Sequence, residues 1–288
     1  MQSFGYVGPD GVSVVAYKSL PPGRPKAIVQ IAHGMAEHFP RYARLTQALN
    51  RAGYAVYGAD HRGHGASAGE AGLGSFGAPG FQALVGDMAV LTGIARQELP
   101  GVPLVLLGHS MGSFAAQLYI LEHAGELAGL VLSGTAAVDM LLGQLMAGGR
   151  TASLEALNAS FEPGRTGFEW LSRDTAEVDA YVADPLCGFE LDAASMQSVF
   201  LLASQARSDP RLSAVPSDLP VYVISGEFDP VVGPGQAFAR ALIASYQDAG
   251  IANIEHRVYP GGRHEMFNET CRDQVEADLI AWLDKTLV

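Results

Sequence analysis

The sequence predicts an α/β fold with a mainly parallel, doubly wound sheet of about eight strands and an inserted helical cap. Three observations carry this prediction. Short apolar runs alternate with longer helical patterns, as in repeated strand-helix units. Several runs are continuously apolar, as expected of strands that helices cover on both faces. One segment, 136–210, breaks the alternation and carries helical periodicity without a convincing parallel strand.

A β-hairpin is expected first, because the turn sequence Gly-Pro-Asp-Gly at 8–11 separates Phe4–Val7 from Val12–Tyr17. The later strands are expected at Ala27–Ala32, Ala55–Gly58, Leu104–Leu107, Leu130–Ser133, Val221–Ser225 and Ile254–Val258. The helices between them are expected at Arg41–Ala52, Gly80–Leu99, Met111–His123, Gln236–Asp248 and Cys271–Leu287. This order predicts a core formed by 1–135 and 211–288, with 136–210 as the cap.

One helix face in the expected cap is apolar. Its residues follow the spacing i, i+3, i+4, i+7, i+8, which places them along one stripe. They are Val138, Leu141, Leu142, Leu145 and Met146. The stripe is either the core of the cap or an acyl-binding surface, and the sequence leaves both interpretations open.

Composition excludes several classes of protein. The 288 residues are 48% hydrophobic and 17% charged, which is typical of globular proteins. The net charge of -12 opposes binding to nucleic acid. The first residues lack a signal-peptide pattern, and no apolar run reaches the roughly 18 residues of a membrane span, so a cytoplasmic protein is expected. Cys187 and Cys271 are far apart and suggest neither a disulfide nor a cysteine-based metal site.

A candidate nucleophile follows the strand at Leu104–Leu107. The sequence Gly108-His-Ser-Met-Gly112 has the pattern G-x-S-x-G and runs directly into a helical stretch. This strand, turn and helix context is that of the nucleophile elbow of α/β hydrolases, in which glycines on either side of the serine relieve crowding. Ser110 is therefore the predicted nucleophile.

A serine hydroxyl needs a base that a carboxylate orients. The chain order serine, acid, histidine leaves His256 and His264 as candidates for the base. His264 is preferred because it lies in a glycine-rich loop, whereas His256 lies inside an expected strand. Asp229 is the predicted acid, since it follows a strand and precedes Pro230, and Glu227 is its competitor.

The oxyanion of the reaction needs two converging backbone N–H groups. Met111, after the nucleophile, should supply one, and Met35 should supply the other, because Gly34 lets the loop approach the substrate. We also expect His38, His109 and Gly34 at the substrate pocket.

The other histidines beside glycines at strand ends raise the question of a zinc site. They lack the helix, the third ligand and the accompanying glutamate of a hydrolytic zinc centre, so hydrogen bonds that brace the loops are expected instead. The histidines in question are His33, His61, His64 and His109. Neither a metal nor a cofactor is predicted for the reaction.

From about residue 25 onward the chain resembles the monoacylglycerol lipase and lysophospholipase branch of the α/β hydrolases. The resemblance implies a cap over the site, a cofactor-free serine mechanism and a single acyl chain in the substrate. It also implies the same catalytic and oxyanion residues, and transient contact with a lipid surface through the cap. The motifs that carry it are His33-Gly-Met-Ala-Glu-His38, Arg41-Tyr42, Asp60-His-Arg-Gly-His-Gly65, Gly108-His-Ser-Met-Gly112, Trp170-Leu-Ser-Arg and Asp184-Pro-Leu.

The sequence thus predicts a serine carboxylic-ester hydrolase that cleaves monoacylglycerols through an acyl-enzyme at Ser110. Alternatives are a lysophospholipase and a carboxylesterase for short or medium chains. An aminopeptidase or amidase is a further rival, because acyl-transfer machinery does not itself select esters. A rival of another class is a binding protein without chemistry, which a complete triad disfavours. The sequence leaves the oligomeric state undetermined.

Overall fold

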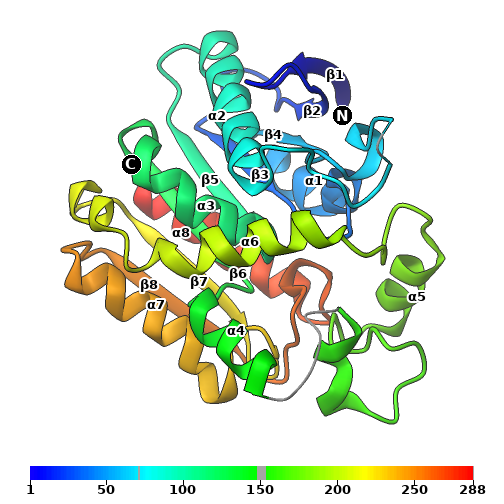
Figure 1. Cartoon of the computed structure of the whole chain (residues 1–288). Helices are drawn as coiled ribbons and strands as arrows, with labels where there is room; N and C mark the ends of the chain where they lie inside the picture. The colour runs from blue at the N-terminus through cyan, green and yellow to red at the C-terminus, as the bar shows by residue number, and fades with distance from the viewer. Residues whose placement is uncertain (71, 148–153, 288) are drawn as a thin grey trace.

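The computed structural model describes residues 1–70, 72–147 and 154–287. An eight-stranded sheet in the order β1-β2-β4-β3-β5-β6-β7-β8 runs through the molecule (Figure 1). Its strands are β1 (Gln2–Val7), β2 (Ser13–Ser19), β3 (Ile28–Ala32), β4 (Ala55–Ala59), β5 (Leu104–His109), β6 (Gly129–Ser133), β7 (Val221–Gly226) and β8 (Ile254–Tyr259). β1, β2 and β4 pair antiparallel and all other neighbours pair parallel. The predicted fold class is confirmed.

Helices cover both faces of the sheet, and period-2 alternation along the strands divides the core between them. In β5, Leu106 packs on the face shared with α3, whereas Val105 and Leu107 pack on the opposite face. This is the pattern of a parallel strand that is buried on both sides. The helices of the core are α1 (Ala43–Arg51), α2 (Phe81–Glu98), α3 (Met111–His123), α7 (Ala237–Asp248) and α8 (Arg272–Thr286).

The predicted boundaries differ from the observed ones mainly at the first helix. That helix was expected from Arg41, but Phe39–Tyr42 forms a 3-10 turn with a proline in its first turn, and α1 begins at Ala43. Proline lacks an N–H and suits the start of such a turn. Arg41 therefore lies on the turn that leads from the loop after β3 into α1.

The segment between β6 and β7 contains helices joined by irregular stretches and no strand in its described part. It contains α4 (Val138–Ala147), α5 (Thr175–Ala183), α6 (Ala193–Ala206) and two 3-10 helices, Glu155–Phe161 and Pro210–Ala214. We call residues 136–210 the inserted segment; residues 148–153 within it lie outside the described part. α6 packs against α3 and α4, while α5 lies to one side of the molecule (Figure 1).

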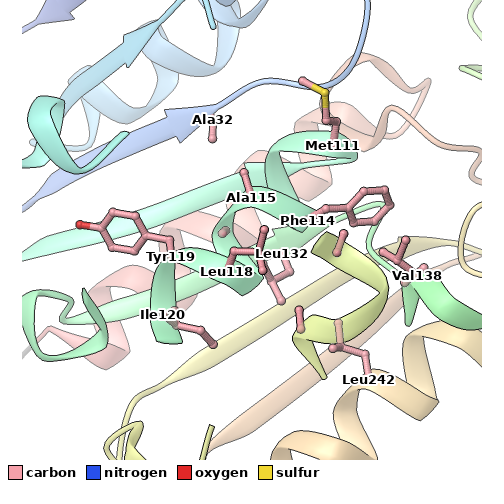
Figure 2. Packing of buried hydrophobic residues seen from close by; sticks show 14 of the residues in the cluster. Ala32, Met111, Phe114, Ala115, Leu118, Tyr119, Ile120, Leu132, Val138 and Leu242 are labelled. Carbon is pink, nitrogen blue, oxygen red and sulfur yellow. The ribbon is translucent and has the colours of Figure 1, made fainter. Parts of the chain in front are cut away.

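α3 lies at the centre of the packing that connects the inserted segment to the sheet. Phe114 and Leu118 of α3 belong to one buried cluster with Leu132 of β6, Val138 of α4 and Leu242 of α7 (Figure 2). Full burial of one such side chain stabilises the fold by about 1.5–3 kcal/mol. α3, which follows the predicted nucleophile, therefore packs against the sheet and against helices of both the core and the inserted segment. Among the described residues, no helix combines the length and apolar character needed to cross a bilayer.

Candidate active site

Ser110 lies at a sharp turn between β5 and α3. Its backbone has φ 51° and ψ -121°, in the left-handed region that side chains rarely adopt. Gly108 and Gly112 permit this turn, because a Cβ on Gly108 would meet the Gly112 backbone and one on Gly112 would meet the Ala32 backbone. The N–H of Ser110 donates to the carbonyl of Ser133 at 2.9 Å. The turn therefore presents the serine at the carboxyl end of the sheet.

His264 and Asp229 form a buried pair. Nδ1 of His264 lies 2.9 Å from both carboxylate oxygens of Asp229, which also accepts from the N–H of Val231. Because a carboxylate can only accept, Nδ1 carries the hydrogen and Nε2 is left with its lone pair. Nε2 is buried without a hydrogen-bond partner among the described residues, and Ser110 and His264 line the same cavity.

Two opposing effects act on the pKa of His264. Burial disfavours the imidazolium, but the Asp229 carboxylate outweighs it, and the pKa of His264 is raised above its usual value. The carboxylate therefore stabilises the cation that forms when His264 accepts a proton.

The ring of His264 contacts two other rings. Trp170 lies on one side with a centroid distance of 4.8 Å, and His109 lies at 4.7 Å. Burial, followed by the neighbouring His264, lowers the pKa of His109 to about 4, so His109 is neutral near pH 7. The backbone N–H of His264 donates to the carbonyl of Trp170, and that of Glu265 donates to Leu171. The inserted segment thus positions the loop that carries His264.

The competing residues lie elsewhere. Glu227 is exposed, and its carboxylate accepts from the backbone N–H of Gly261. His256 lies in the edge strand β8, and its Nε2 pairs with the Ser225 hydroxyl. The structure therefore brings together Ser110 and the pair His264 and Asp229.

The loop after β3 brings Met35 to the cavity that Ser110 and Met111 also line. Neither methionine's backbone N–H has an acceptor among the hydrogen bonds of the described residues. The following residue, Ala36, has φ 54°, which is strained for a residue with a Cβ. Its N–H donates to Nε2 of His64, and its carbonyl accepts from the Tyr181 hydroxyl and the Gly188 N–H, both at 3.0 Å. Three hydrogen bonds thus fix the turn that follows Met35.

His33 and His64 brace the same loop from within. Nε2 of His33 accepts from the N–H of His61, and Nδ1 of His64 pairs with the carbonyl of Arg62. Burial lowers the pKa of His33 to about 4 and that of His64 to about 3, so both rings are neutral near pH 7.

A buried cluster of charged side chains contacts the loop after β3. Arg41 donates to Glu37 at 2.7 Å and forms two hydrogen bonds with Glu265 at 2.6 and 2.7 Å. Glu37 also accepts from the Gly34 N–H and the Tyr42 hydroxyl. Burial opposes ionisation of Glu37, but the Arg41 guanidinium outweighs burial and lowers the pKa of Glu37 to about 2. The cluster connects the loop of Met35 to the loop of His264.

Two cavities meet at Ser110, and both are also lined by Met35, Leu154 and Trp170. The first is almost wholly apolar and extends beneath the inserted segment. Its remaining lining residues are Met111, Phe114, Leu141, Leu145, Leu157, Met196, Phe200 and Val231. The second, which we call the polar cavity, has charged and polar side chains beside apolar ones. Its remaining lining residues are Gly34, Glu37, His109, Leu171, Tyr181, His264 and Glu265.

Three residues of the predicted pocket lie elsewhere. Leu142 does not line either cavity, and Met146 is 71% exposed. At about 100° per residue, Leu141 and Leu145 lie about 40° apart on α4, whereas Met146 lies about 140° from Leu141. The stripe is therefore too wide for one cavity. His38 is also absent from both cavities, because its ring turns away to pair with Asp184 at 2.9 Å.

Sequence analysis did not assign Trp170, Tyr181 or the pair of Arg41 and Glu265 to the site. Trp170 and Arg41 occur in the motifs of the resemblance, so the motifs marked them without indicating a role. Tyr181 and Glu265 carry no local signal, because their contacts form only when distant segments meet.

Comparisons with known proteins agree with this geometry. The model of the Hydrolase_4 family, described as serine aminopeptidase, S33, matches residues 23–271. A monoacylglycerol lipase of Mycolicibacterium smegmatis is 31% identical over 96% of this chain and 95% of its own, and the human monoglyceride lipase is 29% identical over 91% and 83%. A carboxyl esterase from Bacillus coagulans, solved in complex with glycerol, superposes with a TM-score of 0.87 at 28% identity, covering 100% of this chain and 99% of its own. The chain therefore belongs to the Hydrolase_4 (serine aminopeptidase, S33) family and is a monoacylglycerol lipase-like α/β hydrolase.

Proposed function

We propose that this protein is a carboxylic-ester hydrolase that cleaves monoacylglycerols to a fatty acid and glycerol. One observation carries the proposal: an apolar cavity and a polar cavity meet at Ser110. An ester bond placed at Ser110 would direct one acyl chain into the first and a small hydroxylated alcohol into the second. The relatives named monoacylglycerol and monoglyceride lipase support the same substrate class.

In the proposed cycle Ser110 is the nucleophile, His264 the base and Asp229 the acid. Oγ of Ser110 attacks the ester carbonyl while Nε2 of His264 takes its proton, and the N–H groups of Met35 and Met111 stabilise the oxyanion. His264 then protonates the departing glycerol oxygen, which leaves an acyl-enzyme. Finally His264 takes a proton from water, the hydroxide oxygen attacks the acyl carbonyl, and the fatty acid is released with Ser110 restored.

The charges of the polar cavity favour glycerol over the headgroup of a lysophospholipid. Among the described residues Glu37 and Glu265 share one ion-pair partner, Arg41, so the cluster is net negative and repels a phosphodiester. An aminopeptidase would need carboxylates of the inserted segment at Ser110 to bind the ammonium of its substrate. In that segment, Glu162, Glu169 and Glu177 line neither cavity at Ser110, and the side chain of Glu155 lies outside the described part.

A rate profile over acyl chain lengths tests this function. We expect monoacylglycerols with medium or long chains to be cleaved faster than the matching lysophospholipids and than an amino-acid anilide. In Leu145→Trp the larger ring would fill the apolar cavity, so rates for long chains should fall relative to rates for short chains.

Met146→Trp is the matched control on the same helix, assayed with substrates below their critical micelle concentration so that no lipid surface is present. Because Met146 is exposed, its replacement should leave that profile unchanged. If the rates of the unmodified protein fell steadily beyond short chains, the lipase assignment would give way to a general carboxylesterase. Faster cleavage of the anilide would favour the aminopeptidase.

Tyr181 would act on the reaction through the loop of Met35. Tyr181→Phe removes the hydrogen bond to the carbonyl of Ala36, worth about 0.5–1.5 kcal/mol. The turn would then position the Met35 N–H less well, and we expect a fall in kcat of about two- to tenfold with little change in KM. Steady-state kinetics would measure both constants.

Tyr246→Phe provides the control for that variant. The Tyr246 hydroxyl is buried in α7 without a hydrogen-bond partner among the described residues, so its removal should leave kcat unchanged. An equal loss in both variants, or a change in KM alone for Tyr181→Phe, would contradict the role of Tyr181.

We also propose that α4 contacts the lipid surface from which the substrate comes. Met146 lies at its exposed end, and Leu145 of the same turn lines the apolar cavity. An apolar residue at that position would enter the interfacial region of a lipid aggregate at low cost.

A further inference from the structure

Three metal-ligating side chains meet outside the active site. His38 lies on the loop after β3, and Asp184 and Cys187 lie between α5 and α6. Each residue offers one ligand atom, and the three atoms lie within 4.8 Å of one another. His38 and Asp184 already touch, with Nε2 and Oδ2 2.9 Å apart. The cluster therefore joins two segments that are 146 residues apart in the chain.

The donor set is one nitrogen, one oxygen and one sulfur atom. Imidazole, carboxylate and thiolate are the three protein ligands that Zn²⁺ binds, and three of them plus water complete its tetrahedral coordination. His38 is 8% exposed, and its Nδ1 is buried without a hydrogen-bond partner among the described residues. The hydrogen bonds of that part of the chain also give the Cys187 thiol no partner. The Cys187 thiol is thus available as a ligand, and the lone pair of the His38 ring can be placed on Nε2, which faces Asp184.

The surrounding charges favour a cation. Cys187 interacts electrostatically with one guanidinium, that of Arg41, and with the carboxylates of Glu37, Asp184 and Glu265. Glu37 and Glu265 both pair with Arg41, so three carboxylates face one guanidinium around the cluster. A divalent ion that neutralises this excess would gain Coulomb energy in a partly desolvated site.

We propose that His38, Asp184 and Cys187 form a binding site for a thiophilic divalent cation, of which Zn²⁺ is the best match. On binding, the Cys187 thiol releases its proton to solvent and its sulfur bonds to the metal, while Nε2 of His38 and a carboxylate oxygen of Asp184 replace two waters of the ion. No change of oxidation state is involved. A solvent molecule completes the coordination.

The site would act as a crosslink beside the oxyanion loop. Tyr181 and Gly188 of the inserted segment already hold the carbonyl of Ala36, two residues before His38. A metal bound by His38 and Cys187 would add a coordinate link at the same junction. Metal occupancy would thus couple to the position of Met35, although the ion takes no part in the chemistry at Ser110.

The test is protection of Cys187 from alkylation in the Cys271→Ser background, where it is the sole thiol. We expect Zn²⁺ to slow alkylation with saturation at one ion per chain, EDTA to reverse the effect, and Mg²⁺ to have none, because Mg²⁺ prefers oxygen ligands. Asp184→Asn and His38→Gln should each weaken Zn²⁺ binding about tenfold or more, with folding checked by circular dichroism.

His123→Gln is the matched control, because His123 pairs with Glu126 on the surface and belongs to no such cluster among the described residues. Its Zn²⁺ affinity should equal that of the background. Competition with a chromophoric chelator gives a second measurement that does not depend on the thiol, and Cys187→Ser should lose the tight site there. Alkylation that is insensitive to Zn²⁺, or protection that persists unchanged in Asp184→Asn and His38→Gln, would overturn the proposal.

Discussion

Ser110→Ala is expected to lower kcat for monoacylglycerol hydrolysis by about 10⁴-fold or more. The variant retains the strained turn but has no hydroxyl to form the acyl-enzyme, and triad members act as a unit, so the remaining residues cannot replace it. Steady-state assays with a monoacylglycerol would measure the fall in kcat. Labelling by a fluorophosphonate should also be absent in the variant.

The control for this variant is Ser204→Ala on α6, where the exposed serine hydroxyl only contacts the carbonyl of its own helix. It should keep both turnover and labelling. Turnover near that of the unmodified protein in Ser110→Ala would refute the nucleophile, and an unmodified protein that resists the fluorophosphonate would favour a binding protein over an enzyme.

Asp229→Asn is expected to lower kcat by about 10³- to 10⁴-fold with little change in fold. An amide can donate to Nδ1 of His264, which would move the hydrogen to Nε2 and block the base. Burial lowers the pKa of His264, and the variant also loses the carboxylate that opposes burial most strongly, so the pKa would fall. Residual activity should therefore extend to lower pH.

The sign of this pH effect follows from the role of His264. The base works only when neutral, so activity of the unmodified protein should decrease as the pH falls through a pKa above about 6.5. kcat/KM measured against pH would show that limb, and in Asp229→Asn the limb should lie at lower pH. Glu227→Gln is the matched control, since Glu227 is an exposed carboxylate two residues away. Loss of activity in Glu227→Gln, with Asp229→Asn unaffected, would exchange the two assignments.

The sequence was most informative where a single local pattern determines a conformation. Gly108, Ser110 and Gly112 are close in the chain, and the crowding at Gly108 comes from the backbone of Gly112 and Ser113. Asp229 and His264 could be chosen because parallel strands place all their carboxyl ends at one edge of the sheet. For these residues, the order in the chain and the position at a strand end were enough to predict that they lie close together.

The inserted segment was less predictable, because no sheet register fixes where its helices point. The apolar stripe on α4 was visible, but which part of it faces the cavity depends on how α4 lies on α6 and α7. The hydrogen bond from Tyr181 to Ala36 and the contact of Trp170 with His264 likewise depend on the docking of distant segments. Such contacts have no counterpart in local periodicity or spacing.

The backbone link between Trp170 and His264 has a consequence for protein engineering. Residues 170–171 pair directly with residues 264–265, so the inserted segment supports the loop of the histidine as well as covering the cavity. A truncated enzyme without this segment would not become an open esterase, because the histidine loop would lose its partner. A chimaera with a relative's segment should therefore exchange 136–210 together with the loop after β8, treating the two as one exchangeable unit.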